Sequence, residues 1–183
     1  MSELTSVEAL ITLLLNCVCT ELDTAGRPVC SCAVRHAIQW PSMEGCCECE
    51  AASGHAKTHG QAWARFQRAE PVQGTPRADN TQCGRATQVT IDLGVHRCVS
   101  AFDGNSARPP TPAQYTADSL ALINDEYHIR RALSCCPEPQ PAGALAGWRW
   151  DVTTSLPLGP MGGCAGVVVT VVATGIMRAA PVE

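Results

Sequence analysis

The sequence predicts an α+β fold, a two-layer domain in which a mostly antiparallel sheet is packed by two helices. Two segments begin with helix-initiation signals, and five others have the composition or alternation of strands. The length of 183 residues suits one domain. The expected order is helix, strand, strand, strand, helix, strand, strand, in a single domain of residues 1–183 with long loops near 44–59, 72–84 and 103–110.

The first helix is expected to begin after Thr5. Thr5 and Glu8 have the spacing of a capping box, in which each side chain binds a free backbone N–H of the first turn. A Gly-Arg-Pro segment at 26–28 ends the helix. Between these signals, apolar residues recur at i, i+3, i+4 and i+7 and form one stripe: Leu10, Leu13, Leu14 and Cys17.

Three strands are expected between the helices, over residues 29–38, 61–69 and 89–95. In the third, four apolar residues alternate with polar ones, a pattern typical of a strand with one buried face: Val89, Ile91, Leu93 and Val95. We expect the second and third strands to form an antiparallel pair joined by a long loop.

The second helix has a clear start and a clear end. Thr111 is the expected cap, Pro112 takes the first helical position, and Gln114 completes a capping box. The helix must stop before Pro137, since a proline disfavours helical geometry in the residue that precedes it.

The second helix also carries apolar residues at helical spacing. One row is formed by Leu120, Ile123 and Tyr127. The residues that flank this row are Leu122, Ile129 and Leu133. Glu126 and Arg130 are expected to pair at i, i+4 on the exposed side.

Two strands close the chain. Trp148, Trp150 and Val152 alternate with polar residues and predict a strand. Residues 158–163 are expected to form a turn or an extended loop. Residues 165–174 are rich in valine and apolar on both faces, so they predict a central strand.

Charge and composition exclude several functions. A net charge of −4 argues against a general binder of nucleic acid or anionic membranes, which needs clustered basic charge. The longest apolar stretch, residues 9–19, is shorter than the roughly 20 residues that span a bilayer. The first residues are acidic where a signal peptide is basic, so we expect folding in a cytoplasm.

The sequence indicates no catalytic residue and no cofactor. Phosphate-binding signatures are missing. The five histidines and many cysteines allow so many nucleophile–base pairs that no single pair indicates an active site. His96 and His128 lie in regular elements and are expected to be surface or hydrogen-bonded side chains.

Zinc is the one metal that the sequence suggests. The spacing C-x2-C-x5-H-x3-H combines thiolates and imidazoles, the ligands of tetrahedral zinc: Cys46, Cys49, His55 and His59. The five-residue gap between the two halves is shorter than that of a zinc finger, and nearby cysteines blur the pattern.

The other cysteines, twelve in all, have two interpretations. Cys17 and Cys98 best fit free, buried thiols. Disulfides are the alternative, with Cys30 and Cys32 opposite the 46–49 segment and the 135–136 pair near Cys164. The sequence does not decide the connectivity.

The order of the elements resembles the tail-terminator proteins of long, non-contractile-tailed bacteriophages. The matching features are the first helix, the strand at 60–69, the alternating strand at 89–95, the helix from Thr111 and the valine-rich last strand. Arg65-Phe66 and the segment Leu-Gly-Pro-Met-Gly-Gly-Cys-Ala-Gly at 158–166 also resemble Cys-rich head-to-tail connector proteins of phages with GC-rich actinobacterial hosts. The 44–59 loop departs from the terminator pattern.

The resemblance implies a non-enzymatic virion protein of the tail or neck, assembled in the host cytoplasm. It would form a homo-oligomeric, hexameric ring that caps the tail tube, with the tail tube protein and neck or connector proteins as partners. Genome DNA would pass through without sequence-specific binding. The alternatives are an adjacent connector or stopper ring and, from another class, a small zinc-stabilised binding module that uses the four zinc candidates.

Overall fold

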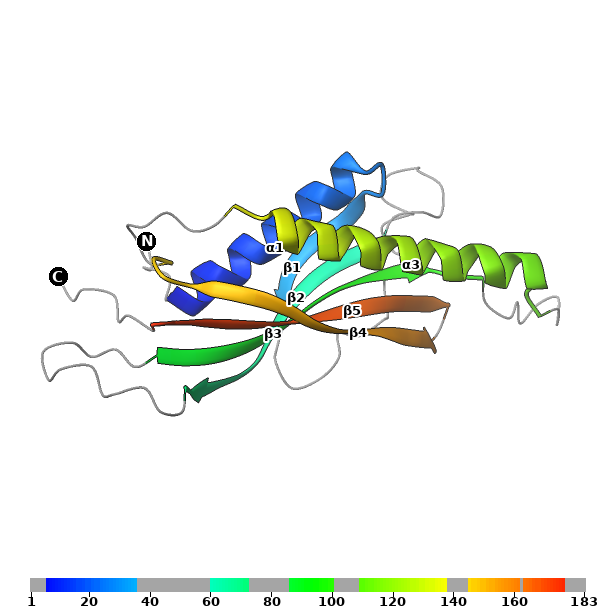
Figure 1. The fold of residues 1–183 in the computed structure, drawn as a ribbon. Helices are drawn as coiled ribbons and strands as arrows, with labels where there is room; N and C mark the ends of the chain where they lie inside the picture. The colour runs from blue at the N-terminus through cyan, green and yellow to red at the C-terminus, as the bar shows by residue number, and fades with distance from the viewer. Residues whose placement is uncertain are drawn as a thin grey trace, which may run out of the picture.

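The structure, a computed structural model, describes residues 6–35, 60–72, 86–100, 109–137, 145–161 and 163–176. In these residues the chain forms two helices and one five-stranded sheet, so the expected α+β class and order of elements are confirmed (Figure 1). The elements are α1 (Ser6–Thr24), β1 (Val29–Arg35), β2 (Gly60–Pro71), β3 (Ala86–Cys98), α3 (Pro112–Cys135), β4 (Arg149–Met161) and β5 (Cys164–Ile176).

The strand order across the sheet is β1-β2-β3-β5-β4. β1 is parallel to β2, and each of the other neighbouring pairs is antiparallel. The expected antiparallel pair is confirmed as β2 with β3, in a register that places Ala64 opposite Leu93. The valine-rich β5 lies between β3 and β4, as a strand apolar on both faces should.

Both helices lie on the same face of the sheet, and the hydrophobic core fills the space between the layers (Figure 1). β3 contributes its odd-numbered residues 89–95, and β5 contributes Val167, Val169 and Val171. In α1 the predicted stripe is partly right: Leu10 and Leu14 are fully buried. Leu13 and Cys17 are only half-buried. The buried stripe includes Ile11, Leu15 and Val18, so its centre is shifted around the helix and Leu13 and Cys17 lie at its edge. Thr5, the expected cap, is outside the described residues.

The prediction that β3 is buried on one face only is wrong. Asp92 and His96 lie on the face turned away from the helices, and they are 0 % and 2 % exposed. The alternation in the sequence correctly identifies the apolar face. It does not reveal that the polar face is covered too, because Trp63 and Arg65 of β2 pack across these residues.

The start and end of α3 are confirmed. The backbone N–H of Gln114 donates to Oγ1 of Thr111 at 3.3 Å, and the backbone N–H of Thr111 donates to Oε1 of Gln114 at 2.8 Å. The helix ends at Cys135, and Cys136 is extended, as the following Pro137 requires.

The expected turn at 158–163 is mostly wrong. β4 continues to Met161, and β5 begins at Cys164. The register of β4 with β5 is irregular between residues 158 and 161, so the strand accommodates the Gly-Pro step instead of ending there. The tight turn is confined to the last residues, where Gly163 has a φ of +82°.

Two disulfides tie α1 to the rest of the domain: Cys17–Cys136 to the end of α3, and Cys19–Cys32 to β1. The prediction that Cys17 and Cys98 are free thiols is therefore wrong, since Cys98 is disulfide-bonded too, as are Cys30 and Cys164. α1 packs against β1 and α3, which brings distant cysteines together.

The expected partners of two cysteines also need correction. Cys32 bonds to Cys19 of α1 and not to the 46–49 segment. Cys136 bonds to Cys17 and does not lie near Cys164, because α3 ends at the opposite end of the sheet from the start of β5 (Figure 1). Cys135 is free and exposed.

Candidate interaction surface

The most distinctive surface of the described residues is the outer face of α3. Leu120, Ile123 and Tyr127, called here the outer row, are 60 %, 61 % and 58 % exposed. The row that the helical spacing predicts therefore lies on the outside of α3 and not in the core. The residues of α3 that are buried instead are Asp125, Ile129, Ala132 and Leu133.

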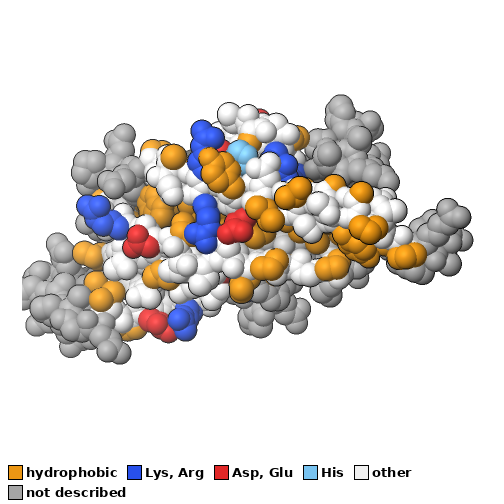
Figure 2. Space-filling view, turned by 45° about the vertical axis from the view of Figure 1, so that its right-hand side comes forward, with side chains coloured by type: hydrophobic (Ala, Val, Ile, Leu, Met, Phe, Trp, Pro, Cys, Tyr) orange, Lys and Arg blue, Asp and Glu red, His pale blue; other side chains and the backbone are white. Residues whose placement is uncertain are grey.

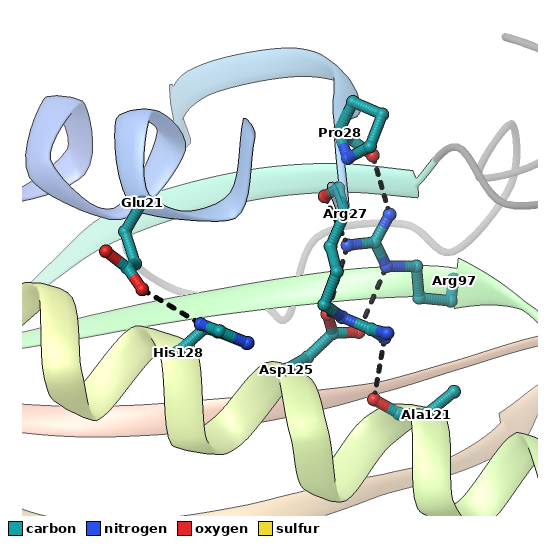
Figure 3. A network of polar contacts seen from close by, with 7 residues as sticks. All are labelled: Glu21, Arg27, Pro28, Arg97, Ala121, Asp125 and His128. Atoms are coloured by element: carbon teal, nitrogen blue, oxygen red, sulfur yellow. Dashed lines mark hydrogen bonds and ion pairs between the residues drawn. The ribbon is translucent and has the colours of Figure 1, made fainter. Parts of the chain in front are cut away.

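A buried ionic network decides which face of α3 points inward (Figure 3). The side chain of Asp125 is fully buried and accepts from Nε of Arg27 at 2.6 Å and Nε of Arg97 at 3.0 Å. Two guanidinium groups compensate the charge of the buried carboxylate. If α3 rotated so that Asp125 faced solvent, Arg27 and Arg97 would both lose their anionic partner. Asp125 and Tyr127 are two positions apart, which is about 200° around a helix. The network therefore holds the outer row toward solvent.

The same network fastens the connection between α1 and β1. Arg97 donates from Nη1 to the carbonyl of Pro28 at 2.7 Å and from Nη2 to the carbonyl of Arg27 at 2.9 Å. Arg27 in turn donates from Nη2 to the carbonyl of Ala121 at 2.8 Å. Two arginines thus join a turn, a central strand and α3 into one rigid unit (Figure 3).

Further contacts anchor the C-terminal half of α3. His128 Nδ1 lies 2.9 Å from Oε1 of Glu21 on α1, which confirms that His128 is hydrogen-bonded. Arg130 contacts Glu126 at 3.1 Å, as the i, i+4 spacing predicts, and donates to Oγ of Ser155 on β4 at 2.6 Å.

The N-terminal half of α3 is different, because none of residues 112–124 is buried. This half extends along the sheet away from α1 (Figure 1). Toward the right of Figure 2, before the grey atoms, hydrophobic side chains drawn in orange lie among white atoms. The one charged side chain of residues 112–124, Asp118, accepts from the backbone N–H of Ser100 at 2.8 Å. A largely apolar surface on a rigid helix is suited to contact with another protein.

The opposite face of the sheet holds a second polar group. Arg65 Nη2 lies 2.7 Å from Oδ2 of Asp92, and Thr170 donates from Oγ1 to Oδ1 of Asp92 at 2.8 Å. These residues come from β2, β3 and β5, three neighbouring strands. The buried carboxylate is thus paired and hydrogen-bonded, and the group fixes the register of the strands.

His96 lies beside this group, and its environment differs from the expected one. Its ring centroid is 5.5 Å from that of Trp63, and its Nε2 has no hydrogen-bond partner among the described residues. Burial, with a smaller effect of the Arg35 charge, lowers the pKa of His96 to about 4. The imidazole is therefore neutral at pH 7, and the expectation of a surface or hydrogen-bonded His96 is wrong.

Among the described residues, two hollows lie beside the end of α3. One, of about 540 Å³, lies between the end of α3 and the start of β4 and includes Leu133, Trp148 and Trp150 in its lining. Trp150 is held in place there, since its Nε1 donates to the carbonyl of Leu133 at 3.0 Å. The other, of about 290 Å³, lies between α1 and α3 and includes Cys17 and Cys135.

The four zinc candidates, Cys46, Cys49, His55 and His59, lie outside the described residues. Of the three expected long loops, residues 44–59, nearly all of 72–84, and 103–108 also lie outside the described residues. Among the residues that the structure describes, no group of three or more His, Cys, Asp or Glu side chains is placed to hold a metal ion. Zinc binding stays a prediction.

Sequence reasoning missed the residues that organise this surface: Arg27, Arg97 and Asp125. A signal exists for one of them. Asp125 shares the helical stripe of Ile129 and Ala132, where a buried acid requires cationic partners. Nothing in the sequence identifies those partners, which lie 98 and 28 positions away.

Neither helix in the described part of the chain is long and apolar enough to cross a membrane. No protein-family model matches the chain, and no curated protein matches its sequence.

Proposed function

We propose that the protein is a structural virion protein of the phage head–tail joint, most simply the tail terminator, which forms a ring on the tail tube and docks it to the neck. The observation that carries the proposal is the outer row, Leu120, Ile123 and Tyr127, exposed on a helix that buried ion pairs hold rigid. The sequence resemblance supplies the biological setting.

A ring subunit must present preformed surfaces to copies of itself. The outer row is such a surface, since three large apolar side chains lie at i, i+3 and i+7 and each is more than half exposed. Burying an apolar side chain of this size contributes about 1.5–3 kcal/mol. Large apolar and aromatic residues are also common in the centre of protein interfaces.

The sheet is compatible with a ring as well. A closed ring needs two different surfaces on each subunit, so that contacts run head to tail. β1 and β4 are the two edge strands and carry different exposed apolar residues, Val34 and Leu156. Edge strands can pair across subunits. A subunit with a net charge of −4 would let DNA pass with little attraction to its phosphates.

To test the proposal, the protein is imaged by electron microscopy with and without tail tubes of the same virus. Native mass spectrometry determines the mass of the assembly that it forms. We expect the wild-type protein to form a closed ring at the end of the tube. Ile123→Asp should weaken ring formation at least tenfold, because the introduced charge would be buried in the contact. Thr12→Asp, on an exposed position of α1, is the matched control and should form rings normally.

The outcomes separate two parts of the proposal. A wild-type protein that never occupies the tube end would overturn the terminator function. If Ile123→Asp forms rings as well as the wild-type protein, the proposed function still holds, but the outer row is not part of the contact between subunits. Circular dichroism of both variants should match the wild-type protein, since both positions are exposed.

A further inference from the structure

Three cysteines gather where α1 meets the end of α3. Cys17 and Cys136 form a disulfide, and Cys135, the residue before Cys136, is the one free thiol among the described cysteines. All three line the hollow of about 290 Å³ between the two helices. A thiol and a disulfide that share one open groove have the arrangement that thiol–disulfide exchange requires.

The three sulfurs differ in their access to solvent. Cys136 is buried, at 7 % exposure, whereas Cys17 is half-buried and Cys135 is exposed. A molecule from solution therefore reaches Cys135 more easily than Cys136. Glu21 lines the same groove, and its carboxylate is 2.9 Å from His128 and 3.4 Å from Arg131. The carboxylate nearest the groove thus has two basic neighbours.

We propose that Cys135 is an exchange site for small-molecule disulfides, through which the Cys17–Cys136 disulfide forms in the folded protein. The inference is independent of the ring function. In the first step, the Cys135 thiolate attacks a small disulfide RSSR, forms a mixed disulfide with one RS group and releases the other as a thiolate. No further oxidant is consumed, because RSSR is the electron acceptor.

Two transfers complete the reaction. The Cys17 thiolate attacks Sγ of Cys135, displaces the second RS thiolate and forms a Cys17–Cys135 disulfide. The Cys136 thiolate then attacks Sγ of Cys17 and displaces Cys135, which returns to the free thiolate while Cys17–Cys136 forms. The net change is one protein disulfide made and one RSSR reduced to two thiols.

The final pairing follows from the geometry of the helix end. Cys136 lies just past α3 with an extended backbone, and it packs with the hydrophobic core. A disulfide from Cys17 to Cys136 lies on the buried side of the groove. A disulfide from Cys17 to Cys135 would lie on its exposed side. The exposed Cys135 is thus the intermediate partner, and the buried Cys136 is the final one.

The experiment starts from the full-length protein, reduced, freed of reductant and then mixed with glutathione disulfide. Samples are alkylated at timed intervals, and fragment-ion mapping follows the peptides that contain Cys17, Cys135 and Cys136. We expect glutathione on Cys135 early and Cys17–Cys136 at the end. Cys135→Ser should slow the appearance of Cys17–Cys136 at least fivefold without changing the end product. Ser134→Ala, the neighbouring exposed position, should leave the rate unchanged.

A second variant traps the intermediate. In Cys136→Ser the last transfer cannot occur, so a Cys17–Cys135 disulfide should accumulate while circular dichroism shows a folded domain. The proposal is overturned if Cys135→Ser forms Cys17–Cys136 at the wild-type rate. It is also overturned if Cys17 and Cys135 of folded Cys136→Ser both remain open to alkylation.

Discussion

Arg97 of β3 and Asp125 of α3 are joined by two hydrogen bonds of 3.0 Å, from Nε to Oδ2 and from Nη2 to Oδ1. The planar guanidinium thus binds both carboxylate oxygens, which fixes the distance and the orientation between helix and strand. Arg27 binds the same carboxylate from the turn after α1. The position of the outer row depends on this one acid.

Asp125→Asn should lower the free energy of unfolding by about 3 kcal/mol. The substitution keeps the volume of the side chain and removes the charge, which leaves two cations beside a neutral amide. Urea titration followed by circular dichroism measures the change. Glu126→Gln, one position along the helix, should cost less than about 0.5 kcal/mol, because its pair with Arg130 is partly exposed. Equal losses for both variants would contradict the role given to the buried network.

The two ends of α3 show which features a sequence can predict. The capping box of Thr111 and Gln114 depends on residues three positions apart, and Pro137 acts on its immediate neighbour. Both signals are local, and both predictions are confirmed. The inward face of α3 is not a local property, because the helix carries apolar residues on two faces. Asp125 decides between them through Arg27 and Arg97, which belong to distant segments.

The cysteines illustrate the same limit. Cys17 and Cys136 are 119 positions apart, and only the packing of α1 on α3 brings them together. The apolar pattern of β3 correctly predicts its core face. The other face of β3 is covered by Trp63 and Arg65 of β2. This cover depends on the pairing of two strands that are separate in the sequence, so the pattern within β3 does not reveal it.

Gly94→Ala should destabilise the domain by about 1–3 kcal/mol. A Cβ atom at this position would lie 2.5 Å from the ring of Trp63 and 2.8 Å from the carbonyl oxygen of Val167. The backbone carbonyl cannot move without disturbing β5, so the added methyl group must displace the indole. Thermal unfolding and the fluorescence spectrum of the tryptophans would both detect this change.

Gly159→Ala is the matched control for the crowding at Gly94. A Cβ at Gly159 would meet nothing within 4 Å. The substitution should therefore change stability by less than about 0.5 kcal/mol. A Gly94→Ala protein as stable as the control, with an unchanged emission spectrum, would show that the indole does not cover Gly94.

The Cys17–Cys136 disulfide should contribute about 2–5 kcal/mol to stability. It closes a segment of 119 residues, so it restricts the unfolded chain strongly. We expect Cys17→Ala to lower the urea midpoint of the oxidised protein, whereas Cys135→Ala, which removes a free thiol, should not. An equal midpoint for Cys17→Ala and the wild-type protein would mean that this disulfide does not stabilise the fold.

His96 should make the domain less stable in acid. The unfolded chain binds a proton at His96 near pH 6.5, whereas the folded protein does so only near pH 4. Between these values the unfolded state binds more protons, so stability falls as the pH is lowered through this window. The full loss for this shift is about 3 kcal/mol.

The measurement compares the wild-type protein with His96→Gln by urea unfolding at several values between pH 7 and pH 4. The variant should start less stable at pH 7, because the glutamine amide has two N–H donors and a carbonyl to satisfy in a buried site, whereas the neutral imidazole has one donor and one acceptor. Its stability should then fall by about 3 kcal/mol less than that of the wild-type protein over the same range, since it has no imidazole to protonate. Parallel pH profiles for the two proteins would contradict a lowered pKa at His96 and would assign the acid sensitivity to the carboxylates, Asp92 and Asp125 among them, that both proteins share.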